Sequence, residues 1–173
     1  MKRFLVSVTI GISSFLWSQV APKTLKTEFT NDALSQKVVG ADGKKVSIKN
    51  ILEKYKGEVL VIDFWASWCK DCILALPKTK ELIVNNPSVK FIYLSLDRSM
   101  TQWKNGLEKY QIKDKENYWF DEGWKNRFNN YIDLNWVPRF IVISQEGGIA
   151  KYYAISPDDP ELQLTIDRLT KKQ

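Results

Sequence analysis

Two apolar runs mark the middle of the chain, at residues 59–62 and 89–96. Runs of this kind, rich in β-branched and other apolar side chains, are typical of strands that are buried on both faces of a sheet. The stretch between them, from about 69 to 85, is compatible with a helix. The order strand, helix, strand predicts an α/β domain.

The pattern of polar and apolar positions predicts further elements on either side of this centre. An Asp-Gly pair at 42–43 lies between two short alternating runs and indicates a β-hairpin. Apolar residues at helical spacing predict three more helices, which begin after Ser99, after Asp121 and at Asp159-Pro160. Shorter strands are expected at 118–120, 140–144 and 149–154. We therefore expect a mixed central sheet with helices on both faces and an N-terminal β-hairpin extension.

The first residues have the composition of a secretory signal peptide. A basic pair, Lys2 and Arg3, precedes an apolar stretch at 4–17, and small residues that suit cleavage follow at Ser18 and Ala21. The apolar stretch is shorter than the roughly 20 residues of a membrane span, so a membrane anchor is the less favoured interpretation. We therefore predict a signal peptide at 1–21, a polar linker at 22–34, one domain at 35–173, and a periplasmic or secreted protein.

Composition narrows the chemistry that the domain can perform. The formal net charge of +6 is dispersed along the 173 residues, so nucleic acid is not an expected partner. There is no histidine, which excludes haem attachment through C-x-x-C-H and zinc sites that contain histidine. The two cysteines alone cannot complete a four-ligand structural zinc site. We therefore expect no metal and no separate cofactor.

The two cysteines, Cys69 and Cys72, follow the first apolar run and are spaced C-x-x-C. If Cys69 opens the next helix, unpaired backbone N–H groups and the helix dipole favour its thiolate and lower its pKa. Cys72 lies on the same helical face, within disulfide reach. An exposed Cys69 and a more buried Cys72 suit thiol–disulfide exchange. A purely structural bridge is the weaker alternative, because so short a loop adds little stability.

The segment WASWCKDC after an apolar strand resembles the thioredoxin superfamily, and Asp63, Trp68, both cysteines and Pro77 fall where that pattern has them. Within the superfamily, residues 35–170 are similar to the TlpA/ResA-like group of extracytoplasmic proteins. The resemblance implies a thioredoxin-like fold and a redox-active disulfide. It also implies that Cys69 is the nucleophile and Cys72 the resolving thiol.

The resemblance assigns roles to residues around the cysteines. Asp63 interrupts a strand that should be buried, where a carboxyl tends to stay protonated. In the family a buried acid exchanges protons with the resolving thiol; an aspartate bonded to backbone is the alternative. The family has a cis-proline at the position of Pro138, which together with Trp68 and Val137 would contact a bound peptide. Arg139 stands where thioredoxins usually carry threonine, and it is expected to lower the thiolate pKa and to engage an acidic substrate.

Two further positions, Ala75 and Tyr93, also depart from the family pattern. Ala75 stands where ResA-like proteins carry a glutamate, which weakens an assignment to cytochrome maturation. Tyr93 replaces a lysine that lies close to the buried aspartate in thioredoxin, so we expect the proton path to differ.

Together these observations predict a periplasmic thiol–disulfide oxidoreductase that acts on protein thiols and disulfides, as a monomer, in cell redox homeostasis. We favour a reductase supplied by a membrane electron donor. Two alternatives stay open. One is a dithiol oxidase or isomerase of secreted proteins, and the other is a non-catalytic binding module on a thioredoxin scaffold.

Overall fold

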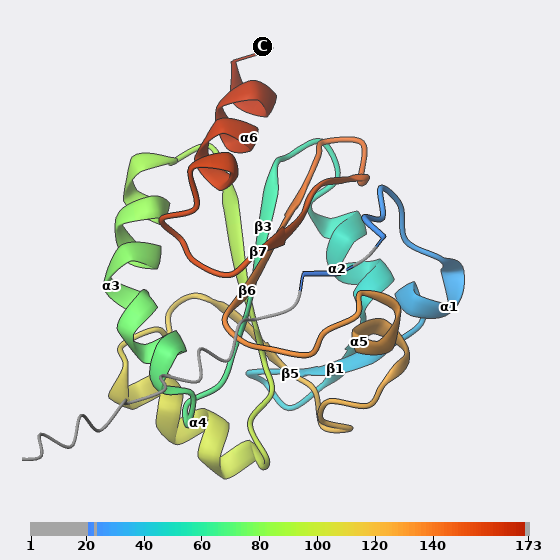
Figure 1. Cartoon of the computed structure of the whole chain (residues 1–173). Coiled ribbons are helices and arrows are strands. Elements are labelled where there is room, and N and C mark those ends of the chain that lie inside the picture. Colours follow the sequence, from blue (N-terminus) through green and yellow to red (C-terminus); the bar gives the residue numbers. More distant parts are fainter. Residues whose placement is uncertain (1–20, 23, 172–173) are drawn as a thin grey trace, which may run out of the picture.

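The computed structural model describes residues 21, 22 and 24–171 (Figure 1). Apart from Ala21, the predicted signal peptide lies outside these residues. Within the described part of the chain, no helix combines the length and the apolar character that a bilayer crossing requires.

A seven-stranded mixed sheet forms the centre of the fold, in the order β2-β1-β5-β4-β3-β6-β7. Strands β3, β4 and β5 run parallel, and the remaining pairs are antiparallel. A hairpin closes each end of the sheet, and Gly43 in the first hairpin has a φ of 81°, a region that favours glycine. The bounds are β1 Lys37–Gly40, β2 Lys45–Ser47, β3 Leu60–Trp65, β4 Lys90–Ser95, β5 Glu116–Trp119, β6 Arg139–Ile143 and β7 Ile149–Ala154.

Helices cover both faces of the sheet, as the sequence predicted. Figure 1 shows α3 and α6 on one side, and α1, α2 and α5 on the other. On the first side Val61 and Val142 of the sheet belong to one core cluster with Leu82 and Ile166. On the second side Phe64 stacks on Phe128, with ring centroids 6.2 Å apart. The bounds are α1 Asn31–Leu34, α2 Ile48–Lys54, α3 Lys70–Asn85, α4 Met100–Lys109, α5 Arg127–Tyr131 and α6 Pro160–Thr170.

The segment predicted as a polar linker, residues 22–34, includes a short helix. Helix α1 begins after Thr30, whose side chain accepts a hydrogen bond from the backbone of Ala33. The residues before α1 pack on the body of the domain. Lys26 forms an ion pair with Asp133 at 2.8 Å, and Phe29 stacks on a core ring at 5.3 Å.

The prediction that a helix begins directly after Asp121 is wrong. Residues 121–124 form turns, and α5 begins only after Asn126. The Asn126 side chain accepts a hydrogen bond from the backbone of Asn129 at 2.9 Å, which makes it the N-cap. Asp121 is instead paired with Lys45 of β2 at 2.5 Å. Asp121, which the local pattern placed at the start of a helix, therefore forms a long-range ion pair instead.

Candidate redox site

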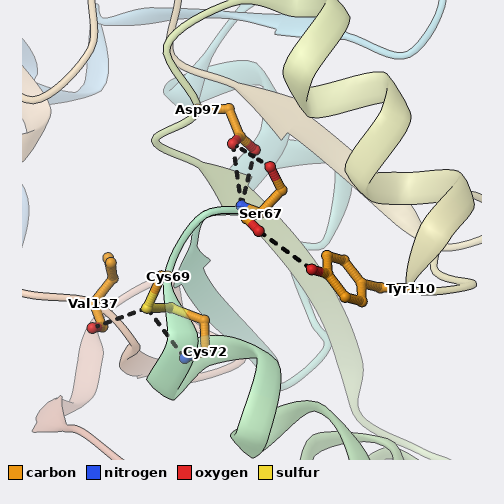
Figure 2. Close-up of a disulfide and its surroundings, with 6 residues drawn as sticks. All are labelled: Ser67, Cys69, Cys72, Asp97, Tyr110 and Val137. Carbon is orange, nitrogen blue, oxygen red and sulfur yellow. Dashed lines mark hydrogen bonds between the residues drawn. A yellow bond between two sulfur atoms is a disulfide. The ribbon is translucent and has the colours of Figure 1, made fainter.

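The two cysteines lie where β3 passes into α3. Cys69 is the N-cap of this helix, and its Sγ accepts a hydrogen bond from the backbone N–H of Cys72 at 3.1 Å. Figure 2 shows the two sulfur atoms joined as a disulfide at this junction. Unpaired N–H groups at a helix start stabilise negative charge. A reduced Cys69 in this place therefore favours the thiolate.

Cys69 is buried in the structure, whereas the sequence predicted an exposed side chain. Its side chain is 7% exposed, against 2% for Cys72, so the predicted order holds but the difference is small. Cys69 Sγ lies 3.5 Å from the carbonyl oxygen of Val137, and the peptide bond between Val137 and Pro138 is cis. The structure thus brings together four of the residues that the sequence analysis singled out.

A buried carboxylate that the sequence analysis did not assign to the site holds the loop before Cys69. Asp97 is 1% exposed and follows β4. It accepts hydrogen bonds from the Ser67 backbone N–H at 3.1 and 3.2 Å, from the Ser67 hydroxyl at 2.7 Å and from the Ser95 hydroxyl at 2.8 Å. Figure 2 shows the Ser67 bonds beside the disulfide, with the Tyr110 hydroxyl donating to the Ser67 carbonyl at 3.4 Å. Asp97 therefore positions the loop that carries the cysteine.

Helix α4 reaches the same loop because one of its residues has no side chain. A Cβ placed on Gly106 would lie 2.5 Å from the Cβ of Ser67. No pair of carbon atoms packs at that distance, so glycine is required for this approach. The only sequence signal was a lone glycine inside a helical pattern, which marks close packing in some helices.

Asp63 lies in the middle of β3 as a buried acid. It is 4% exposed, and within the described residues its Oδ1 has no hydrogen-bond partner. Burial raises the pKa of the Asp63 carboxyl well above its usual value. Its direct neighbour on β4 is Tyr93, whose hydroxyl is also unpartnered among the described residues. Burial and the charge of Asp63 raise the pKa of Tyr93 in turn. The observed environment does not match the alternative of an aspartate held by backbone bonds at Oδ1.

Arg139 does not face a substrate, which corrects the expectation that it engages an acidic partner. It is 1% exposed, and its guanidinium donates to the carbonyls of Tyr152 at 2.8 Å and Ile132 at 3.5 Å. The same group lies 4.4 Å from the ring centroid of Tyr153. Burial lowers the pKa of Arg139. In the register of the sheet it pairs with Phe64, so it shares a face with that ring and not with Asp63.

Trp68 borders an apolar cleft beside the disulfide. The side chain is 42% exposed, and its ring centroid lies 6.5 Å from that of Trp124. The cleft has a volume of about 330 Å³ and is also lined by Cys69, Trp136 and Val137. The sequence predicted a helix over this segment, and helical spacing could not reveal that a turn places Trp124 at the cleft.

The described residues include no group of three or more histidine, cysteine, aspartate or glutamate side chains arranged to hold a metal ion. The groups that the structure places at the disulfide are the sulfur pair and the backbone around it.

The fold and the site together define a class: a thioredoxin-like α/β domain with a C-x-x-C disulfide at a helix start and a cis-proline beside it. The family model described as thioredoxin-like matches residues 57–149, which is more than half of the chain. The chain belongs to the thioredoxin-like family. Within that family, its ResA relatives support a place in the TlpA/ResA-like group.

Among curated proteins, the chain is 28% identical over 111 residues to the thiol-disulfide oxidoreductase ResA of Bacillus cereus. That match covers 63% of this chain and 61% of the relative, so the chain spans about three fifths of the length of that protein. A thioredoxin H-type of Fagopyrum esculentum is 35% identical over 60 residues, which is 35% of this chain and 48% of the relative.

Solved structures show the same fold. The solution structure of a candidate thiol-disulfide oxidoreductase from Bacteroides vulgatus is 29% identical, with a TM-score of 0.67, and covers 84% of this chain and 92% of its own. A candidate electron transfer protein from Aquifex aeolicus has a TM-score of 0.63 and covers 87% of this chain and 100% of its own, at 18% identity. The thioredoxin-like fold predicted from the sequence is thereby confirmed.

Proposed function

We propose that the chain is a thiol–disulfide oxidoreductase that exchanges its Cys69–Cys72 pair with protein thiols and disulfides. The observation that carries the proposal is the place of Cys69 at the start of α3, where its sulfur accepts the Cys72 N–H at 3.1 Å. This geometry favours a thiolate nucleophile. The Val137 carbonyl at 3.5 Å lies next to the attacking sulfur and offers a backbone contact to a bound peptide. The names of the ResA relatives support the same activity.

In the reducing direction, the Cys69 thiolate attacks one sulfur of a substrate disulfide. A bond forms between Cys69 and that sulfur, and the other substrate sulfur leaves as a thiolate. Cys72 then attacks Cys69 Sγ, which forms the internal disulfide and releases the second substrate sulfur. Two electrons pass from the protein dithiol to the substrate, and an external dithiol donor restores the reduced pair.

Asp63 is the proposed proton acceptor for Cys72. The resolving thiol must lose its proton before it attacks, and a carboxylate with a raised pKa is a stronger base than an exposed one. Asp63 is buried, and its Oδ1 is free of hydrogen bonds within the described residues. Proton transfer would use the lone pair that this atom keeps.

The setting of the reaction is also part of the proposal. The signal-like N-terminal sequence, a basic pair followed by an apolar stretch, supports export to an oxidising compartment. A reductase in that compartment needs electrons from outside it, so a dithiol donor in the membrane is the partner that we propose.

Insulin reduction tests the activity directly. With dithiothreitol as donor, the wild-type chain lacking residues 1–21 should accelerate insulin precipitation, and Cys69→Ser should react at the rate of dithiothreitol alone. Cys72→Ser keeps the nucleophile and should accumulate a mixed disulfide through Cys69. A wild-type protein without acceleration, or a Cys69→Ser variant as fast as wild type, would favour the non-catalytic binding module.

The reduction potential of the pair tests the direction of electron flow. A reduction potential of about −270 mV, the thioredoxin end of the known range, would support the proposal that the protein acts as a reductase. A value near about −120 mV would make the protein an oxidant of newly exported substrates.

A further inference from the structure

The cleft beside Cys69 is built from three distant parts of the chain. Trp68 lies in the loop after β3, Trp124 in the turn after β5, and Trp136 directly before the Val137–Pro138 bond. Three tryptophans meet at one end of the reactive disulfide. Such convergence is a feature of side-chain pockets, which combine apolar walls with a few polar groups.

The chemistry of the lining selects against charge. The charged lining residues are Lys70 and Asp71, whose opposite signs leave no net charge at the rim. The guanidinium of Arg98 lies 5.8 Å from the ring centroid of Trp68 and supports that ring from outside the cleft lining. The rest of the lining is mainly apolar, with the three indole rings and Val137, and it also includes the Cys69 sulfur and the neutral amide of Asn135. An apolar group therefore enters at no electrostatic cost, whereas a charged group would lose its hydration.

The cleft is large enough to hold one large side chain. At about 330 Å³ it lies near the lower end of the roughly 300–1,000 Å³ that ligand pockets have. A second hollow, which shares Asp71 with the cleft, is lined by Pro138 together with the exposed Leu74 and Ile155. This second hollow also has polar lining residues, among them Lys78 and Asp158, so a surface of mixed character continues past the cis-proline, where an extended chain crossing the site would lie.

We propose that the tryptophan cleft is a subsite that selects substrates with a large apolar side chain next to the reacting cysteine. The inference rests on the proposed function, because the exchange reaction fixes where the occupant lies. Its sulfur must reach Cys69, and Cys69 itself lines the cleft. A neighbouring side chain of the same substrate then lies against Trp68 and Trp124. The occupant is a peptide segment with a leucine-like or aromatic residue beside its cysteine.

Short peptides in mixed disulfide with glutathione provide the test. Each carries one cysteine flanked by leucine, tryptophan, serine or aspartate, and the reduced protein releases the peptide thiol and glutathione while its own pair becomes oxidised. The measurement is the second-order rate constant from tryptophan fluorescence. We expect the leucine and tryptophan peptides to react on the order of 10-fold faster than the serine peptide, the size of effect that apolar pockets give.

Variants locate the preference in the cleft. Trp124→Ala should reduce the leucine-to-serine rate ratio toward one, and Trp124→Phe should retain most of it because an aromatic wall remains. Leu164→Ala removes an apolar side chain that is 50% exposed on α6, remote from the cleft lining, and should keep the wild-type ratio.

The outcomes separate this inference from the proposed function. If the wild-type protein reduces all four peptides at one rate, or prefers the aspartate peptide, the subsite assignment is overturned while the exchange activity stands. An unchanged ratio in Trp124→Ala also overturns it. If neither the peptides nor glutathione disulfide react, the proposed function itself fails.

Discussion

The buried carboxyl of Asp63 should make the stability of the oxidised protein fall as the pH rises. Burial raises the pKa of Asp63 in the folded state above its usual value of 3.8, and the unfolded chain has no such burial. Between those two pKa values the folded protein keeps a proton that the unfolded chain has released. The stabilising contribution is therefore complete below pH 3.8 and is lost as the pH rises through the folded-state pKa.

The size of the effect follows from proton linkage. One proton held only by the folded state changes the free energy of unfolding by up to about 1.4 kcal/mol for each pH unit. With a urea dependence of about 1–3 kcal/mol per molar for a domain of this kind, the unfolding midpoint should fall by up to roughly 0.5–1.4 M for each pH unit over which only the folded state keeps the proton. The sequence has no histidine, and the cysteines are bonded. Few other groups titrate between the ordinary carboxyl range and about pH 8, so the effect of Asp63 is not masked there.

Urea unfolding of the oxidised protein at several pH values measures the slope, and Asp63→Asn removes it. The amide cannot ionise, so the free energy of unfolding of Asp63→Asn should not fall with pH in this way. The stability of the variant relative to wild type should therefore increase as the pH rises. Glu53→Gln changes an acid whose side chain is 60% exposed and should keep the wild-type slope. Parallel stability curves for wild type and Asp63→Asn would refute the reasoning, whatever their vertical offset.

Two further predictions concern the loop before Cys69. Asp97→Asn replaces an acceptor oxygen by an N–H₂ group, so one serine donor loses its partner. We expect the free energy of unfolding to fall by about 1–2 kcal/mol and the redox equilibrium constant with glutathione to change. An unaltered equilibrium constant would show that Asp97 does not position the site. Gly106→Ala should lower stability by about 1–3 kcal/mol through overpacking against Ser67, although alanine normally favours a helix by about 1 kcal/mol. Thermal unfolding checks the second prediction, with Asn105→Ala on the exposed side of α4 as the control, and a raised melting temperature for Gly106→Ala would contradict it.

Features written in local sequence were predictable. The Asp-Gly turn sets the first hairpin, and Asp159 followed by Pro160 caps α6 as expected. The apolar run 89–96 placed both bounds of β4 within one residue, and the run 59–62 placed the start of β3 within one residue, although β3 continues to Trp65. In each case the residues that decide the structure are neighbours in the chain, so spacing alone carries the information.

Features that depend on distant partners were not predictable. Asp97 meets Ser67 thirty residues earlier in the chain, and no local pattern marks that bond. Arg139 is buried because the Tyr152 carbonyl and the Tyr153 ring enclose it, whereas its position after the proline suggested a group facing the substrate. The place of Trp124 at the cleft also depends on distant contacts. Asp121 pairs with Lys45 of β2, and the segment 121–124 forms turns where the local pattern predicted a helix.

The docked N-terminal segment bears on where the domain can be cut for recombinant work. The Thr27 carbonyl accepts a hydrogen bond from the Ile149 backbone N–H at 2.7 Å, and Phe29 stacks on Phe128. A chain shortened to begin at residue 35 would expose that core ring and leave the β7 amide without its acceptor. Purification tags and surface tethers are better joined ahead of Leu25, whose side chain is 68% exposed.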